Sequence, residues 1–289
     1  MTAGTKMRLS VLLGDHPHTA ALKAGAIASD LVALDFAHYS PTNKGFKPMV
    51  REGAFDVAEM AIVTYLMAMS FGKPMVLLPS VMMARHQFRF AWTHPSAGIA
   101  GPKDLAGKRV GIRSFTTTTG AWLRGILANE HGVDLDAVEW VTFEEPHVAE
   151  YIDTTTRASA GKAIMPMLRD GELDAVLGET SDDPRLQLLF ADAPVEETHW
   201  MARHDMVPIN HMVVVSTQLS QERPDVVREV YRMLEASRMA AADRSPSFDR
   251  AAMDRSLALI TDYAAQQKLI PRRFGVDELF DDVTRALRG

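Results

Sequence analysis

The chain has 289 residues, of which 47% are hydrophobic and 24% charged, which is the balance of a folded globular protein. Its 31 lysines and arginines are outnumbered by 37 aspartates and glutamates, and the formal net charge of -6 excludes a protein built to bind nucleic acid, which needs clustered positive charge. With 0 cysteines, the chain has no disulfide framework, thiolate zinc site or cysteine nucleophile.

Hydropathy along the chain predicts a cytoplasmic protein with no membrane partner. The apolar run 9–13 is too short for the core of a signal peptide, and no small-residue cleavage site follows it. No stretch of about 18 apolar residues is present, so no membrane-spanning helix is expected.

Short apolar runs alternate with helical patterns through the first third of the chain. Near-continuous hydrophobic strands in such an order are typical of a mainly parallel sheet that helices cover. The expected strands are 7–13, 31–39, 56–60 and 75–82, and the expected helices are 18–27, 46–51 and 62–71.

A second series of the same kind follows residue 98. Its expected strands are 109–113, 138–143 and 173–177, and its expected helices are 119–129 and 158–170. A strongly β-branched strand then comes at 208–216. Three amphipathic helices are expected to complete the chain, at 224–242, 250–267 and 276–287.

These two series predict an α/β protein with two lobes. Lobe 1 would combine residues 1–94 with 208–289, and residues 95–207 would form lobe 2 as an insertion. The chain would cross between the lobes twice, so that a cleft lies between them. Ligands of open α/β folds bind at the carboxyl ends of strands, and we expect the ligand in this cleft.

The segment 81–125 is basic although the protein is acidic. It contains seven lysines and arginines and a single acid, Asp104, which favours an anion site. Three of the cations come next to strand ends or turns and are the candidates for binding the anion: Arg85, Arg89 and Arg113. Three others are interpreted as parts of an ordinary solvated face: Lys103, Lys108 and Arg124.

A loop rich in hydroxyl groups opens the helix expected at 119–129. The free N–H groups at a helix start, with serine or threonine hydroxyls beside them, can cradle a carboxylate or a phosphate. A plain helix cap needs one such residue, whereas this loop has four consecutive threonines. We therefore expect Ser114, Thr117 and Thr118 to contact the ligand.

Histidines and one glutamate form a second group of candidates. His16 and His18 flank a proline just after the first strand, Glu59 lies at the third strand, and His211 stands beside Asn210 in the returning strand. Each alone is more often a structural residue, but together they could supply a proton donor that works near neutral pH. A metal site built from the three histidines and Glu59 is the alternative. No HExxH or other tight ligand spacing supports it, and no metal is expected.

Several segments resemble the 4,5-dihydroxyphthalate decarboxylase family. That family has similar FDVxEM, RxFRH-like and PIxH segments, with a proline-containing strand before the second. The matching segments here are Phe55-Asp-Val-Ala-Glu-Met60, Pro79, Arg85-His-Gln-Phe-Arg-Phe90, Lys103-Asp-Leu-Ala-Gly-Lys-Arg-Val-Gly111 and Pro208-Ile-Asn-His211. The resemblance extends to about residue 216. It implies a two-lobe fold like that of type II periplasmic binding proteins, in which DLxGKRVG also occurs.

The chain departs from the family pattern at residues expected to line the cleft. Asp15-His-Pro-His-Thr19 stands where family members often have a YDRT-like sequence. Ser114-Phe-Thr-Thr-Thr-Thr119 replaces an EYQxTA-like approach to the helix, and Phe90 replaces a histidine.

The resemblance implies decarboxylation of a hydroxylated aromatic dicarboxylate in aromatic catabolism, without an organic cofactor. A ring hydroxyl para to the departing carboxylate would push electrons into the ring, and a protein acid would protonate the ring carbon. In this hypothesis His211 or His18 is the acid, and Glu59 orients a histidine or a phenol. Arg85, Arg89 and Arg113 bind the retained carboxylate, supported by the residues already named at the helix start. The remaining substrate contacts would come from His16 and Asn210.

Two alternatives stay open. One is a non-catalytic solute-binding protein of the same fold that holds a small organic anion. The other is a cofactor-free enzyme that acts on another precursor, such as a pyrimidine or menaquinone intermediate. The methionine-rich stretch 60–83 fits either a core or a contact in a homo-oligomer, and a core is favoured.

Overall fold

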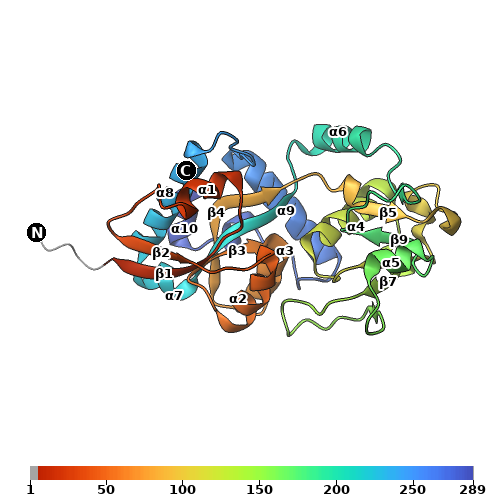
Figure 1. Ribbon diagram of the computed structural model, residues 1–289, viewed down its shortest axis with the longest axis horizontal. Coiled ribbons are helices and arrows are strands. Elements are labelled where there is room, and N and C mark those ends of the chain that lie inside the picture. The colour runs from red at the N-terminus through yellow and green to blue at the C-terminus, as the bar shows by residue number, and fades with distance from the viewer. Residues whose placement is uncertain (1–5, 289) are drawn as a thin grey trace, which may run out of the picture. The chain divides into compact units, whose positions relative to one another are not determined.

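The computed structural model describes residues 6–288 (Figure 1). The chain divides into two compact units, each of which has its own sheet. Unit 1 comprises Met1–Ala84, Ile209–Ala258 and Phe274–Gly289, and unit 2 comprises Arg85–Pro208 and Leu259–Arg273.

Two segments fall in a different unit from the one expected. Residues 85–94 belong to unit 2 because their strand β5, Ala91–Thr93, pairs with β9, Ala175–Leu177. Residues 259–273 also belong to unit 2, where the ring of Tyr263 packs edge-on against Trp122 at 5.7 Å. Tyr263 and Trp122 are far apart in the sequence, so a local sequence pattern cannot predict their contact.

Unit 1 is built on a five-stranded sheet in the order β2-β1-β3-β11-β4. The first three pair in parallel, whereas β11 runs antiparallel to both of its neighbours. The sheet is therefore mixed, because the returning strand inserts between two strands of the first series. The strand bounds are β1 Met7–Leu12, β2 Val32–Phe36, β3 Val57–Ala61, β4 Met75–Ala84 and β11 Ile209–Ser216.

Helices cover this sheet and complete the core of unit 1. The apolar face of α8 packs on strand side chains such as Leu9, Val11 and Val213, and Figure 1 shows α8 and α1 near one another beside the sheet. Met60, Met67 and Met82 are buried, in line with the core interpretation of the methionine-rich stretch. The helices that lie in unit 1, wholly or in part, are α1 Ala20–Lys23, α2 Phe46–Glu52, α3 Ile62–Ser70, α7 Thr217–Glu222, α8 Pro224–Ala240, α9 Arg250–Gln266 and α10 Asp282–Arg285.

Two helices expected in unit 1 are much shorter than predicted. The helix expected at 18–27 starts with a 3-10 turn, Pro17–Thr19, and α1 stops before Gly25, which has a φ of 74°. The segment expected as one helix at 276–287 is interrupted at Phe280, whose backbone is extended. Asp281 then caps α10 by accepting a 2.8 Å hydrogen bond from the Thr284 N–H.

Unit 2 is built on a six-stranded sheet in the order β10-β5-β9-β6-β7-β8. Its four strands β9, β6, β7 and β8 pair in parallel, and β5 and β10 add an antiparallel edge. The remaining bounds are β6 Arg109–Ile112, β7 Glu139–Thr142, β8 Thr156–Arg157, β10 Gln187–Leu188, α4 Thr118–His131, α5 Ile164–Arg169 and α6 Ala193–His204. The helix expected at 158–170 begins only at Ile164, after Gly161 with a φ of 83°.

None of the helices described between residues 6 and 288 has the length and hydropathy needed to cross a membrane.

Candidate functional site

The sheet of unit 1 brings Glu59 and His211 together. The register between β3 and β11 places Val213 opposite Glu59 and His211 opposite Ala61. Side chains alternate along a strand, so residues 59 and 61 share a face with residues 211 and 213. Glu59 and His211 are thus diagonal neighbours on one face of the sheet.

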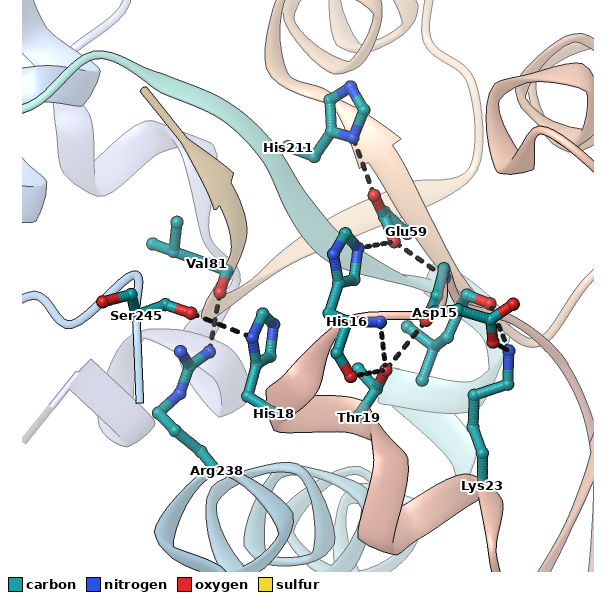
Figure 2. Close-up of polar contacts among 12 residues, drawn as sticks. Asp15, His16, His18, Thr19, Lys23, Glu59, Val81, His211, Arg238 and Ser245 are labelled. Carbon is teal, nitrogen blue, oxygen red and sulfur yellow. Dashed lines mark hydrogen bonds and ion pairs between the residues drawn. The ribbon is translucent and has the colours of Figure 1, made fainter. Parts of the chain in front are cut away.

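Glu59 is a buried carboxylate that three groups hold (Figure 2). Its Oε1 lies 2.7 Å from His211 Nδ1, and its Oε2 lies 2.9 Å from His16 Nε2. The Gly14 N–H donates to Oε2 at 2.9 Å. A Cβ atom on residue 14 would lie 2.7 Å from His16 Nε2, so only glycine permits this approach.

The charge of Glu59 fixes the proton positions of both histidines. Burial acts to raise the pKa of Glu59, but the hydrogen bonds from His16 and His211 outweigh it and hold the pKa well below its usual range. Glu59 is therefore an anion, and each histidine directs a ring N–H at it. The second nitrogen of each ring is left for a ligand, and both side chains are partly exposed, at 18% and 17%.

His18 lies against His16 and belongs to the same cluster. The two rings stack with centroids 5.0 Å apart and an interplanar angle of 6°. His18 Nδ1 lies 3.1 Å from the Ser245 carbonyl oxygen, to which it must donate (Figure 2). Its Nε2 is buried and has no hydrogen-bond partner within residues 6–288.

The surroundings of His18 make it an acceptor instead of an acid. Burial, and then the nearby charge of Arg238 and the proximity of His16, lower the pKa of His18 to about 4. At neutral pH the ring is neutral, with its proton on Nδ1 and a lone pair on Nε2. A neutral His18 is suited to accept a hydrogen bond, and the assignment of the proton donor among the histidines stays a prediction.

The turn between β1 and α1 holds the two stacked histidines in place. Thr19 Oγ1 accepts from the His16 N–H at 3.0 Å and donates to the Gly14 carbonyl at 2.8 Å. Lys23 donates to the Leu13 carbonyl at 3.2 Å and pairs with Asp15. The departure from the family pattern at residues 15–19 is therefore a hydrogen-bonded turn that presents two imidazoles.

In unit 2, hydroxyl groups and an arginine lie at the start of α4. Thr117 is the residue that precedes the helix, and its side chain makes no capping hydrogen bond. Arg85 Nη2 donates to Thr119 Oγ1 at 3.1 Å, and its guanidinium lies 3.9 Å from the centroid of the Phe90 ring. Phe90, a departure from the family, thus supports an arginine beside the helix start.

A second arginine lies behind the first turn of α4, and the interpretation of it as solvated is wrong. Arg124 is 0% exposed. It donates to Gln267 Oε1 at 2.8 Å and to the Phe115 carbonyl at 2.6 Å, and no carboxylate of the described chain pairs with it. Burial lowers the pKa of Arg124 to about 9, so the group remains a cation at neutral pH.

The unused donor of Arg124 faces the helix start. Its Nη1 is buried without a partner in the described part of the chain. A Cβ on Gly120 would lie 3.1 Å from this Nη1 and 2.8 Å from Thr117 Oγ1, which places both groups around the first turn. The unpaired cation adds to the positive end of the helix dipole, so an anion at this start is favoured by two effects.

The other predicted site residues have partners of their own. Arg89 pairs with Glu197 at 3.3 Å, and Arg113 pairs with Glu144 at 3.2 Å. Ser114 Oγ lies 3.1 Å from Thr116 Oγ1. Thr118 is the first residue of α4, and Asn210 is buried next to His211. The structure therefore favours Arg85, with the unpredicted Arg124, over Arg89 and Arg113 as the cations for a ligand.

Within residues 6–288, no group of three or more histidines, aspartates or glutamates is arranged to hold a metal ion. The second nitrogens of His16, His18 and His211 can accept hydrogen bonds and transfer protons.

Comparison with known proteins gives a consistent picture of the family. A family model described as NMT1/THI5 like matches residues 33–245, which is more than half of the chain. The 4,5-dihydroxyphthalate decarboxylase of Comamonas testosteroni is 26% identical over 256 residues, covering 83% of this chain and 77% of the relative. The 4,5-dihydroxyphthalate decarboxylase of Pseudomonas putida is 26% identical over 211 residues, which cover 68% of this chain and 81% of the relative. The predicted resemblance to these decarboxylases is confirmed.

Solved structures confirm the type II two-lobe fold. The sulfonate-binding protein SsuA of Methylobacillus flagellatus is similar, with a TM-score of 0.58, 12% identity and coverage of 98% of this chain and 93% of that one. The desulfurization enzyme DSZB is similar with a TM-score of 0.54, 14% identity and coverage of 97% and 98%. Since one of these is a binding protein and the other an enzyme, the fold alone leaves the activity open.

Proposed function

This chain belongs to the NMT1/THI5-like family, and from that premise we propose that it is a cofactor-independent decarboxylase of a hydroxylated aromatic dicarboxylate resembling 4,5-dihydroxyphthalate. The names of its two relatives support the reaction class. The observation that carries the proposal is the Glu59 carboxylate held between His16 and His211, with a neutral His18 beside them. A site that only binds an anion has no need of a buried carboxylate that orients two histidines.

The start of α4 would bind a carboxylate. The Thr117 hydroxyl and Arg85 would donate to it, with the Arg124 charge behind them. The departing carboxylate should have no arginine partner, because such a pair would stabilise the ground state more than the transition state.

Decarboxylation replaces the bond from the ring carbon to CO2 with a bond to hydrogen. His18 Nε2 would accept a hydrogen bond from a ring hydroxyl, which increases the electron density at the para carbon. His211, protonated at Nε2, would donate its proton to that carbon. The electron pair of the breaking C–C bond then restores the aromatic ring as CO2 leaves. Glu59 would stabilise the His211 cation through Nδ1, as a carboxylate does for a histidine acid.

The test is release of CO2 from 4,5-dihydroxyphthalate by wild type and by His211→Asn. We expect the monoacid product with wild type, and a loss of at least a hundredfold in kcat with the variant, which should still bind the dicarboxylate. His204→Asn is the matched control, because His204 pairs with Glu130 at 2.8 Å in unit 2. Tight binding without CO2 from wild type would overturn the proposal in favour of a solute-binding protein. Unchanged kcat in His211→Asn would overturn the assignment of the acid.

A further inference from the structure

Unit 1 contains a pocket that the proposed reaction does not use. It has a volume of about 240 Å³ and lies among β4, α8, α9 and the loop 241–249. Four arginines and one carboxylate, Glu235, line it. The arginines are Arg238, Arg244, Arg250 and Arg288.

Two of these arginines form a fixed, buried wall. The Arg238 side chain is 11% exposed and donates to the Val81 carbonyl at 2.6 Å and to the Pro246 carbonyl at 2.5 Å. The Arg288 side chain is 1% exposed and is held by Asp254 and Asp277, which are not part of the lining. Its Nε is buried and has no partner among the described residues.

The positive charge of the other two arginines is not neutralised by a close carboxylate. Arg244 forms no hydrogen bond or ion pair with any residue between 6 and 288, and it is exposed. Arg250 lies 3.8 Å from Asp254, a carboxylate that is already bound to Arg288 at 2.5 Å. Two cations at the same pocket without a close carboxylate of their own favour a ligand group with two negative charges.

Apart from Tyr231 and Ser247, which carry hydroxyl groups, the rest of the lining is apolar and includes an aromatic ring. Pro79, Val81, Met239, Phe248 and Met253 supply this surface. A free inorganic ion would leave it uncovered, whereas an organic body would bury it.

We propose that this pocket binds an organic dianion, in which a phosphate or paired carboxylates meet the arginines and an aromatic or aliphatic body covers the apolar wall. The site is distinct from the start of α4, and the inference does not depend on the decarboxylase assignment.

The pocket shares its wall with the histidine cluster. The loop that supplies Arg244, Pro246 and Phe248 also accepts the His18 hydrogen bond at Ser245. Figure 2 shows His18 directed at Ser245 and Arg238 directed at Val81, which lines the pocket. A ligand in the pocket would therefore order the carbonyl group that orients His18.

The test is calorimetric titration of the full chain with phenyl phosphate, phthalate and inorganic phosphate. We expect phenyl phosphate, phthalate or both to bind more tightly than inorganic phosphate, and the tighter of the two identifies the preferred head group. In the double variant Arg244→Gln/Arg250→Gln, the dissociation constant of that ligand should rise at least tenfold. Arg228→Gln, an exposed arginine of α8 outside the lining, should leave it unchanged.

Several results would contradict the inference. If neither organic dianion binds at millimolar concentration, or if the double variant binds as wild type does, the inference is wrong. Thr117→Val separates this site from the start of α4, because binding in the pocket should survive that substitution. Bound ligand should also slow hydrogen exchange in residues 243–249, and unchanged exchange would contradict the link to His18.

Discussion

A single carboxylate determines the chemistry of the cluster in unit 1. Two imidazoles and a backbone N–H satisfy Glu59, so that its negative charge is stable although it is buried. The same hydrogen bonds fix which nitrogen of each histidine is left for a ligand. The sequence analysis names Glu59 and His211 as candidates, but their contact depends on the pairing of β11 with β3, two strands far apart in the sequence that no local pattern brings together.

Glu59→Gln tests whether the charge acts in the reaction. The amide retains the shape but cannot stabilise a protonated His211, so we expect kcat to fall tenfold to a hundredfold with little change in KM. Steady-state kinetics measures this. Glu130→Gln, which alters the His204–Glu130 pair of unit 2, is the control and should retain wild-type kcat. Equal losses in both variants would assign Glu59 a structural role only.

The pKa of His18 predicts how stability depends on pH. The folded protein binds this proton only near pH 4, whereas the unfolded chain binds it near its ordinary value of 6.5. Between these values the unfolded state holds more protons, so stability falls as the pH falls from about 6.5 to about 4. We expect His18 to contribute on the order of 1–2 kcal/mol to this loss.

Urea denaturation across this pH range measures the effect. His18→Asn keeps a donor for the Ser245 carbonyl but does not titrate, and its free energy of unfolding should change less with pH. An identical pH dependence in both proteins would show that His18 is not held neutral.

At the scale of elements, α4 is a largely buried helix with a buried cation behind its first turn. Ten consecutive residues of this helix, 118–127, are buried, which hides the amphipathic pattern that a surface helix would show. An arginine inside a helix is usually solvated, and this is why the sequence pattern assigns Arg124 to the surface. The contacts that bury it, from Gln267 and Phe115, come from segments whose proximity no local pattern encodes.

Arg124→Met tests the role of this buried charge. Methionine has a similar length and replaces a buried cation that has no carboxylate partner. Because its burial carries no charge penalty, we expect the free energy of unfolding to change by no more than about 2 kcal/mol. Affinity for phthalate, which has no hydroxyl, should fall about tenfold at the α4 site. Arg203→Met removes an arginine that is 51% exposed in unit 2 and is the control for charge. Unchanged phthalate affinity in Arg124→Met would contradict the assignment.

Packing of α4 against α9 explains a glycine in the helix. A Cβ on Gly125 would lie 2.0 Å from the Tyr263 ring, so Gly125→Ala should destabilise the protein by about 1–3 kcal/mol. Thermal unfolding measures the loss. Adding Tyr263→Leu should recover part of it, since the smaller side chain makes room. If the losses of Gly125→Ala and Tyr263→Leu simply add in the double variant, the Tyr263 ring is not the group that the added methyl contacts.

Most long elements are predictable from the sequence, and the short ones are not. Strands such as 7–12 and 209–216, and the helix 224–240, have enough apolar repeats to identify them. Strands β8 and β10 have two residues each, too few to form a pattern, and pairing with neighbours defines them. The helix expected at 158–170 is longer than the observed one because apolar spacing alone gives no account of the turn at Gly161.

At the scale of the whole molecule, the family match and the similar solved structures point to the same two-lobe fold. The activity depends on particular side chains. The two-lobe fold occurs both in a sulfonate-binding protein and in a desulfurization enzyme. What favours an enzyme in this chain is a set of groups able to move a proton, together with relatives named as decarboxylases. That set is partly predictable from the sequence, but the neutral state of His18 depends on burial that only the structure shows.

The most direct measurement is the fate of 4,5-dihydroxyphthalate incubated with the protein in deuterated water. The account predicts one CO2 for each monoacid formed, with deuterium on the ring carbon that lost its carboxylate, and none of this in His211→Asn. Recovery of the intact dicarboxylate from a protein that binds it tightly would contradict the account.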